Sequence, residues 1–314
     1  MKNKIVIAGG TGFLGSALEK YFLTQNWQVA ILTRHPTKPN HHKWDGQDLG
    51  SWTEVLENAT VLINLCGQSV DCRYTEKNKN ILLSSRLLPT RLLHQALELC
   101  SAPPSLFINA SSSTIYVHSE DQPMTEKTGV IGHDFSMSVV RKWEAAFFEK
   151  EIEGIRKVAM RTSIVLGKEG GAYPKLKQIT KLGLGGHQGT GRQMVSWIHI
   201  EDYCRAVQHI IDTRYLEGAI NVTGPNPVNN KEFMREIRAM VRPLFHINQP
   251  KWLLEFGAVL MRTETELLLK SRYVIPERLE KSGFEFRYKT ISDLRQSNSA
   301  RASKSMEFFS QLGQ

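Results

Sequence analysis

The sequence is poor in cysteine and has no long uninterrupted apolar run. Its 314 residues include 4 cysteines, and none of them lies at the Cys-x-x-Cys or Cys/His spacing that is typical of a metal site. So few thiols favour a reducing, cytoplasmic setting over a disulfide-stapled secreted one. The most apolar later stretch, 252–269, is interrupted by glutamates and an arginine, which argues against a membrane span.

Basic runs with interleaved aromatic residues are also missing, although the chain is basic overall. Lys and Arg total 40 against 31 Asp and Glu, which gives a net charge of +9. Because no basic cluster or nucleic-acid motif is present, we predict no nucleic-acid partner and interpret the excess as diffuse solvated charge. An anionic ligand such as a nucleotide would still be attracted to a basic protein.

The most informative motif of the sequence lies at its start. An apolar run over 5–8 breaks into glycine at positions 9, 10, 12 and 15, and apolar residues then recur at helical spacing. A Gly-x-Gly-x-x-Gly pattern between a strand and a helix predicts dinucleotide binding, because its glycines allow a tight turn, close approach of the pyrophosphate and close packing of the helix. The helix start also offers free N–H groups to the phosphates. We expect cofactor contacts from Gly9, Thr11, Gly12, Phe13, Leu14 and Gly15.

The end of the second predicted strand, 28–33, indicates which dinucleotide is bound. An NAD-binding protein usually carries an acidic residue there for the ribose 2′-hydroxyl. This chain has Thr33 followed by Arg34, and an arginine can pair with a 2′-phosphate through charge-assisted hydrogen bonds. We therefore predict NADP rather than NAD, although Arg34 could also be a surface residue that caps a turn.

Two further predicted strands, 60–65 and 105–109, should end beside the cofactor, because ligands of such sheets bind at the carboxyl ends of the strands. The residues expected to line the cofactor at these ends are Leu65, Cys66, Gly67 and Ser111. A cluster of hydroxyl side chains follows the second of these strands, and it should lie where the nicotinamide of the cofactor sits. The alternative is that these serines only satisfy backbone groups in a loop.

The order of strand and helix patterns predicts the fold class. Strands and helices alternate up to about residue 228, which indicates an α/β protein with a Rossmann-type, doubly wound parallel sheet over 1–228. A smaller, mostly helical C-terminal substrate lobe is expected over 229–295, and the polar tail, 296–314, is expected to fray. The glycine-rich segment 167–193 reads as irregular and too long for a simple connector, so we interpret it as a substrate loop or lid.

Taken together, these residues resemble the extended branch of the short-chain dehydrogenase/reductase superfamily. Within it, the chain is similar to an atypical sugar-nucleotide epimerase subgroup with a small extra C-terminal domain. The resemblance covers residue 5 to about residue 294 and implies a Rossmann sheet with a C-terminal substrate lobe. The motifs that carry it include Gly9–Gly15, Thr33–Pro36, Ile63–Gly67, Ser85-Arg86, Trp143-Glu144, Arg161-Thr162, Gly191–Gln193, Ser196–Ile200 and Gly283–Phe286.

The chain departs from the superfamily at the proton-transfer residues. The Tyr-x-x-x-Lys pair of the superfamily is absent, because the matching positions are Ser136 and Val140. An arginine that grips the diphosphate in nucleotide-sugar enzymes is replaced by Val195. By position, the resemblance leaves Ser112, Tyr116 and Arg86 as candidate catalytic residues, and Arg86 replaces an asparagine of the superfamily. Other candidates for proton transfer are Lys142, Asp134, His199 and Cys66.

Two functions remain open at this point. The first is an NADP-dependent epimerase or oxidoreductase that acts on a small substrate, of which a sugar-like molecule is one candidate. The alternative is a non-catalytic NADP(H)-binding sensor or scaffold, which the absent Tyr-x-x-x-Lys pair favours. The retained serines and the glycine-rich segment favour the enzyme. The resemblance is also compatible with a homodimer formed through the helices near 77–100 and 135–150.

Overall fold

The computed structural model describes residues 2–255, 264 and 266–295, so the tail expected over 296–314 lies outside the described residues. Within this described part, seven parallel strands form one sheet in the order β11-β6-β5-β4-β1-β2-β3. The strands are β1 Lys4–Ala8, β2 Gln28–Thr33, β3 His41–Lys43, β4 Val61–Asn64, β5 Leu106–Ser112, β6 Arg156–Thr162 and β11 Gly218–Val222.

The strand order confirms the predicted doubly wound sheet. The chain starts in the middle of the sheet with β1, proceeds outward through β2 and β3, and then returns to the other side of β1 with β4. The switch point lies between β1 and β4, whose paired residues run from Ile5 and Val61 to Ala8 and Asn64. Ligands of doubly wound sheets bind at this point, outside the carboxyl ends of the strands.

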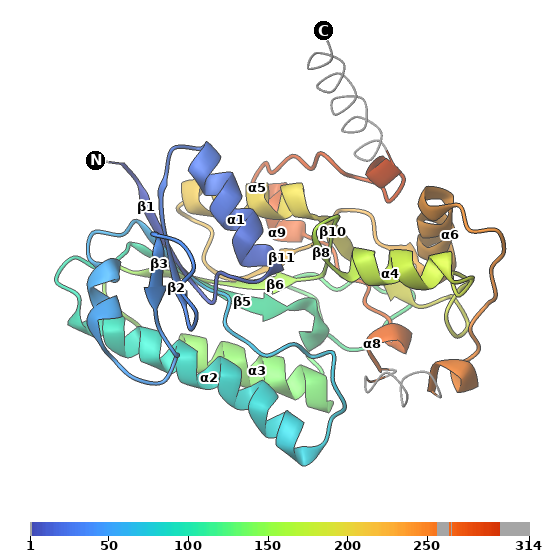
Figure 1. Ribbon diagram of the computed structural model, residues 1–314, viewed down its shortest axis with the longest axis horizontal. Coiled ribbons are helices and arrows are strands. Elements are labelled where there is room, and N and C mark those ends of the chain that lie inside the picture. The colour runs from blue at the N-terminus through green and yellow to red at the C-terminus, as the bar shows by residue number, and fades with distance from the viewer. Residues whose placement is uncertain (1, 256–263, 265, 296–314) are drawn as a thin grey trace, which may run out of the picture.

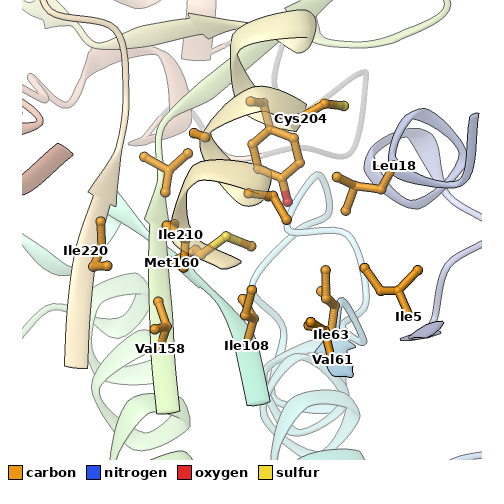
Figure 2. Close-up of a cluster of buried hydrophobic side chains, with 14 of the residues drawn as sticks. Ile5, Leu18, Val61, Ile63, Ile108, Val158, Met160, Cys204, Ile210 and Ile220 are labelled. Atoms are coloured by element: carbon orange, nitrogen blue, oxygen red, sulfur yellow. The ribbon is translucent and has the colours of Figure 1, made fainter. Parts of the chain in front are cut away.

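Helices cover both faces of the sheet (Figure 1). One face carries α1 (Phe13–Thr24), α5 (Ile200–Asp212) and α9 (Glu277–Lys281), and the other carries α2 (Glu76–Leu99) and α3 (Phe135–Phe148). The strands between them are apolar on both sides, as expected for a sheet that is buried on both faces. Figure 2 shows Leu18 of α1 and Cys204 of α5 packed above Ile63 and Ile108 of the sheet.

The remaining elements form a smaller region at the end of the sheet where the strands terminate. A short sheet has the order β10-β7-β8, and β9 pairs with β12. The helix α4 packs with α6 around a shared apolar cluster that includes Tyr173, Trp197 and Phe233. The elements are β7 Ile164–Gly167, β8 Gly170–Gly171, α4 Ala172–Lys181, β9 Met194–Val195, β10 Trp197–His199, β12 Val228–Asn229, α6 Asn230–Val241 and α8 Glu266–Leu269.

The segment 167–193 is less irregular than the sequence predicts, because it contains β8 and α4. Its first glycines give room to an aromatic ring from the glycine loop. A Cβ atom at Gly167, Gly170 or Gly171 would lie 2.7, 2.5 or 2.8 Å from the Phe13 ring. Part of the glycine content that suggested a lid is therefore needed for packing. The Phe13 ring, which packs on these glycines, connects the glycine loop to the smaller region. Across the described ranges, no helix is both long and apolar enough to cross a membrane.

Candidate cofactor and substrate site

The glycine loop has the backbone shape that a bound pyrophosphate requires. Gly9 adopts a φ of +69°, a conformation that side chains disfavour. A Cβ at Gly15 would lie 2.2 Å from the carbonyl oxygen of Gly10, so only glycine lets α1 pack this closely on the loop. A Cβ at Gly12, in contrast, would meet no atom within 4 Å. The loop thus combines a tight turn, close helix packing and an open face.

The start of α1 is left free for an anion. Gly12 is its N-cap residue and has no side chain to bond the first N–H groups, and the first turn contains no acidic residue. Among the described residues, the first-turn N–H groups thus have no capping side chain. These N–H groups lie at the positive end of the helix dipole, and this arrangement binds phosphate. The residues present therefore fit the pyrophosphate of a dinucleotide.

The turn after β4 is held by a buried polar network. The Asn64 side chain accepts a hydrogen bond from the Cys66 N–H at 3.0 Å and donates to Asn109 of β5 at 2.7 Å and to Thr90 of α2 at 3.0 Å. These bonds fix Leu65 and Cys66 beside the glycine loop, where the sequence places the cofactor. Burial raises the pKa of the Cys66 thiol to about 12, which favours its neutral form.

Arg34 follows the last residue of β2 and is exposed. Within the described part of the chain, its guanidinium has no hydrogen-bond or ion-pair partner. Thr33 accepts a hydrogen bond from the backbone N–H of His35 at 3.3 Å, which turns the chain at this point. Arg34 is therefore available to an anion at the strand end next to the glycine loop.

The end of β5 contributes serines with different surroundings. Ser111 is buried, and its hydroxyl donates to Glu144 of α3 at 2.5 Å. Glu144 also accepts two hydrogen bonds from Arg161 of β6, at 2.9 and 2.7 Å. Burial lowers the pKa of Arg161, but the hydrogen bonds and charge of Glu144 outweigh it and leave the pKa raised. This ion pair anchors the strand end, and the predicted cofactor contact of Ser111 stays a prediction.

Ser112 faces a cleft instead. Its hydroxyl oxygen accepts the N–H of Thr114 at 3.1 Å, so its proton remains available to a ligand in the cleft. The cleft has a volume of about 380 Å³. The residues that line it include Ser112, Ser113, Thr114, Ser136, Thr162, Leu176, Gln188, Gln193, Val195, Asn230, Glu266, Lys270 and Arg272. Polar side chains from the sheet, α3, the segment 167–193 and the C-terminal segment thus meet in one place.

A half-buried arginine, Arg272, lines this cleft beside Val195, the position where the resemblance places an arginine in nucleotide-sugar enzymes. Arg272 pairs with Val195 in a β-bridge, and its backbone N–H donates to Met194 at 2.8 Å. Burial lowers the pKa of Arg272 to about 10. No carboxylate of the described residues forms an ion pair with it. The stretch of chain that pairs with Val195 therefore carries an arginine that lines the cleft.

The structure places Tyr116 and Arg86 away from the cleft lining. Tyr116 is fully buried, and its hydroxyl is held by Asn221 at 2.9 Å and Arg161 at 2.8 Å. Arg86 donates to the carbonyl oxygens of Leu82 and Gln68 at 2.8 and 3.1 Å. Their structural roles are visible, whereas their catalytic roles stay predictions.

The sequence-based search missed Glu266, Lys270 and Arg272. They belong to a stretch without any recognisable motif, and more than a hundred residues separate them from the serines that they join. No local signal could have identified them, because their position in the cleft depends on how the C-terminal segment folds back. In the described ranges, no group of three or more His, Cys, Asp or Glu side chains is placed to hold a metal ion.

A second cavity, of about 700 Å³, lies between α1 and α5. It starts at Thr11 and Gly12 but continues along Lys20 and Thr24 on the outer side of α1. The dinucleotide of a doubly wound sheet lies over the strand ends instead. We therefore assign the cofactor to the strand ends and not to this cavity.

Comparison with known proteins identifies the family. The model of the NAD dependent epimerase/dehydratase family matches residues 5–223. The chain belongs to this family. A model described as a domain of unknown function (DUF1731) matches residues 249–294 of this epimerase family member. The predicted membership of the extended short-chain dehydrogenase/reductase superfamily, with an extra C-terminal domain, is thereby confirmed.

Relatives align over nearly the whole length. The epimerase family protein YfhF of Bacillus subtilis (strain 168) is 34% identical over 295 residues, which cover 91% of this chain and 95% of YfhF. The epimerase family protein ML0860 of Mycobacterium leprae is 32% identical over 297 residues, or 93% and 94% of the two chains. The crystal structure of human epimerase family protein SDR39U1 (isoform 2) with NADPH superposes with a TM-score of 0.83 at 28% identity, covering 93% of this chain and 98% of that one.

Proposed function

We propose that this epimerase family member is an NADP(H)-dependent oxidoreductase or epimerase that acts at a hydroxyl or carbonyl carbon of a small, sugar-like substrate. The observation that carries the proposal is the position of Ser112. It ends the strand next to β4, beside the cofactor-type turns, and it lines the polar cleft. When bound, the nicotinamide would accept or supply a hydride at this point.

The chain's own residues would perform the other tasks. The uncapped start of α1 would hold the pyrophosphate, and Arg34 would hold the 2′-phosphate. The Ser112 hydroxyl would donate a hydrogen bond to the reacting oxygen, which stabilises negative charge that develops there. Arg272 would orient an anionic part of the substrate. The NADPH in the human relative's structure supports the choice of NADP(H) over NAD(H).

Arg34→Ala should separate the two cofactors. Losing a charge-assisted contact to the 2′-phosphate should weaken NADPH binding by about 2 kcal/mol, or about thirtyfold in Kd. The Kd for NADH should hardly change, because NADH has no such phosphate. Isothermal titration of both cofactors measures the difference, and Arg91→Ala, another exposed arginine, is the control. Equal weakening of both cofactors would contradict the assignment of Arg34.

Ser112→Ala should lower turnover about tenfold, the effect of one hydrogen bond to a charged oxygen, while the Kd for NADPH stays the same. The matched control is Ser105→Ala just before the other end of β5, where the hydroxyl is exposed and bonds the Thr60 carbonyl. NADPH consumption with small carbonyl compounds is the measurement. Turnover equal to that of the control would remove Ser112 from the mechanism.

A non-catalytic NADP(H) sensor is the second candidate, and the missing Tyr-x-x-x-Lys pair favours it. A sensor would bind NADPH tightly, and the absorbance of the reduced nicotinamide would then stay constant with every carbonyl or hydroxyl compound offered. An enzyme needs a group that moves a proton within hydrogen-bond reach of the substrate. The choice between the two functions therefore depends on whether the cleft contains such a group.

A further inference from the structure

One wall of the cleft contains a chain of hydrogen-bonded groups from distant parts of the sequence. Ser136, in the first turn of α3, donates its hydroxyl proton to Glu266 Oε1 of α8 at 2.5 Å. The Lys270 ammonium lies 2.5 Å from the same carboxylate oxygen and 2.6 Å from Asp134 Oδ2. Ser136, Glu266 and Lys270 line the same cleft as Ser112. A hydroxyl, a carboxylate and an ammonium thus meet beside the proposed reaction site.

These groups are shielded from solvent but not sealed. Ser136 is 7% exposed, and the side chains of Lys270 and Glu266 are 14% and 27% exposed. The adjoining Ser271 fixes the segment, since its N–H donates to His118 at 3.0 Å and its hydroxyl accepts the N–H of Met194 at 2.7 Å. These bonds hold the segment that carries Lys270 against His118 and Met194 at this wall of the cleft.

We propose that Ser136 and Glu266 form the proton relay for the reacting oxygen of the substrate, and that Lys270 holds Glu266 in position. This inference rests on the proposed function, because a relay is needed only if the cleft carries out chemistry. It also gives the C-terminal domain a task, since Glu266 and Lys270 lie within residues 249–294. By the resemblance, Ser136 stands where the superfamily has its catalytic tyrosine.

The direction of the existing hydrogen bond fixes how the relay works. Because the Ser136 proton points to Glu266, the serine offers its oxygen lone pairs to the cleft. When a substrate hydroxyl reacts, its O–H bond breaks and the proton binds to Ser136 Oγ, while the Ser136 proton moves to Glu266 Oε1. One negative charge passes from Glu266 to the substrate oxygen, where the Ser112 hydroxyl can donate to it. The C–H bond at the same carbon then breaks, its hydride would go to the oxidised nicotinamide dinucleotide, and a neutral carbonyl remains. The reverse transfer protonates the oxygen when a carbonyl is reduced by the nicotinamide dinucleotide.

Activity measurements on the full chain test the relay directly. The probes are NADPH with DL-glyceraldehyde, dihydroxyacetone, D-xylulose or pyruvate, and the readout is loss of reduced-nicotinamide absorbance. Ser136→Ala and Glu266→Gln should each lower kcat about 100-fold, the size of a lost proton-transfer group, with little change in KM. The matched controls are Ser138→Ala, whose hydroxyl bonds the His133 carbonyl, and Glu264→Gln, whose carboxylate bonds the Tyr74 N–H.

Rescue separates proton transfer from a structural role. In Glu266→Ala, added formate should restore part of kcat, because a small carboxylate can enter the space that the side chain leaves. Formamide, which has the same shape and cannot act as a base, should not. Equal restoration by both compounds, or by neither, would overturn the assignment of Glu266 as the proton acceptor.

A measurement on the cofactor-free protein tests the contact itself. Ser136→Ala and Glu266→Ala each remove the same hydrogen bond, so the shift in the unfolding midpoint of the double variant should be smaller than the sum of the single shifts. Additive shifts would overturn the contact. If the wild type neither consumes NADPH with any probe nor inverts the configuration of any chiral probe, the proposed function fails and the relay fails with it. If the wild type is active and both relay variants match their controls, the relay fails while the proposed function stands.

Discussion

Replacing Glu144 by alanine should lower the free energy of unfolding by about 3 to 5 kcal/mol, the usual result of removing one partner of a buried ion pair. The Glu144 and Arg161 side chains are only 10% and 11% exposed. Without the carboxylate, the Arg161 guanidinium and the Ser111 hydroxyl would lose their acceptor in a site that water barely reaches. The strand ends that carry the proposed active site should loosen as well.

The control is Glu149→Ala, just beyond the end of the same helix. Its partner is Arg91, and both side chains are 55% exposed, so the loss should stay within about 1 kcal/mol. Replacing Glu144 and Arg161 together by methionine should recover most of the lost stability, since no unpaired charge remains. Urea unfolding measures all of these values. A loss for Glu144→Ala no greater than that of the control would contradict the structural role of the pair.

Gly15→Ala should cost about 3 kcal/mol of stability, the upper range for an overpacked site, and weaken NADPH binding about 100-fold, which corresponds to about 2.7 kcal/mol. The added Cβ would lie 2.2 Å from the oxygen and 2.4 Å from the Cα of Gly10. Both are backbone atoms, so no side-chain rotation relieves the clash. The helix start must move, and its N–H groups then no longer meet the phosphates.

Gly12→Ala separates these two effects. Its Cβ would enter open space, with nothing within 4 Å, and the φ of −81° suits any residue. Stability should therefore stay close to that of the wild type, while the Cβ obstructs the approach of the pyrophosphate and weakens NADPH binding. Thermal unfolding and fluorescence titration with NADPH are the measurements. An unfolding midpoint of Gly15→Ala equal to the wild-type value would contradict the close packing of α1.

Local sequence patterns were enough to predict the cofactor half of the fold. The second strand was expected over 28–33, and β2 has these bounds. The glycine loop was recognisable because several of its glycines are required by the local backbone geometry, such as the positive φ of Gly9. The buried strand near 60–65 was visible from its apolar run. These features depend on residues that are close together in the chain, so the local sequence pattern is enough to predict them.

The proposed catalytic half could not be predicted in this way. The helix α4 lies in a segment whose glycines suggested a loop, and the space they leave is filled by Phe13 from a distant part of the chain. The serine at position 136 reads as a missing tyrosine in the sequence. Its hydrogen bond to Glu266, at 2.5 Å, is visible only in the tertiary structure, and the proposed role rests on that bond. Such contacts depend on the path of the whole chain, which no short pattern encodes.

The sequence by itself therefore determined a Rossmann-type sheet, its glycine loop and the strand ends that face a dinucleotide, because steric and periodic demands act within a few residues. The tertiary structure decided the rest. It buried Glu144 against Arg161, placed Arg272 beside Val195, and brought α8 to the start of α3. Burial and close approach give these polar groups their strength, and both arise only when residues far apart in the sequence are brought together.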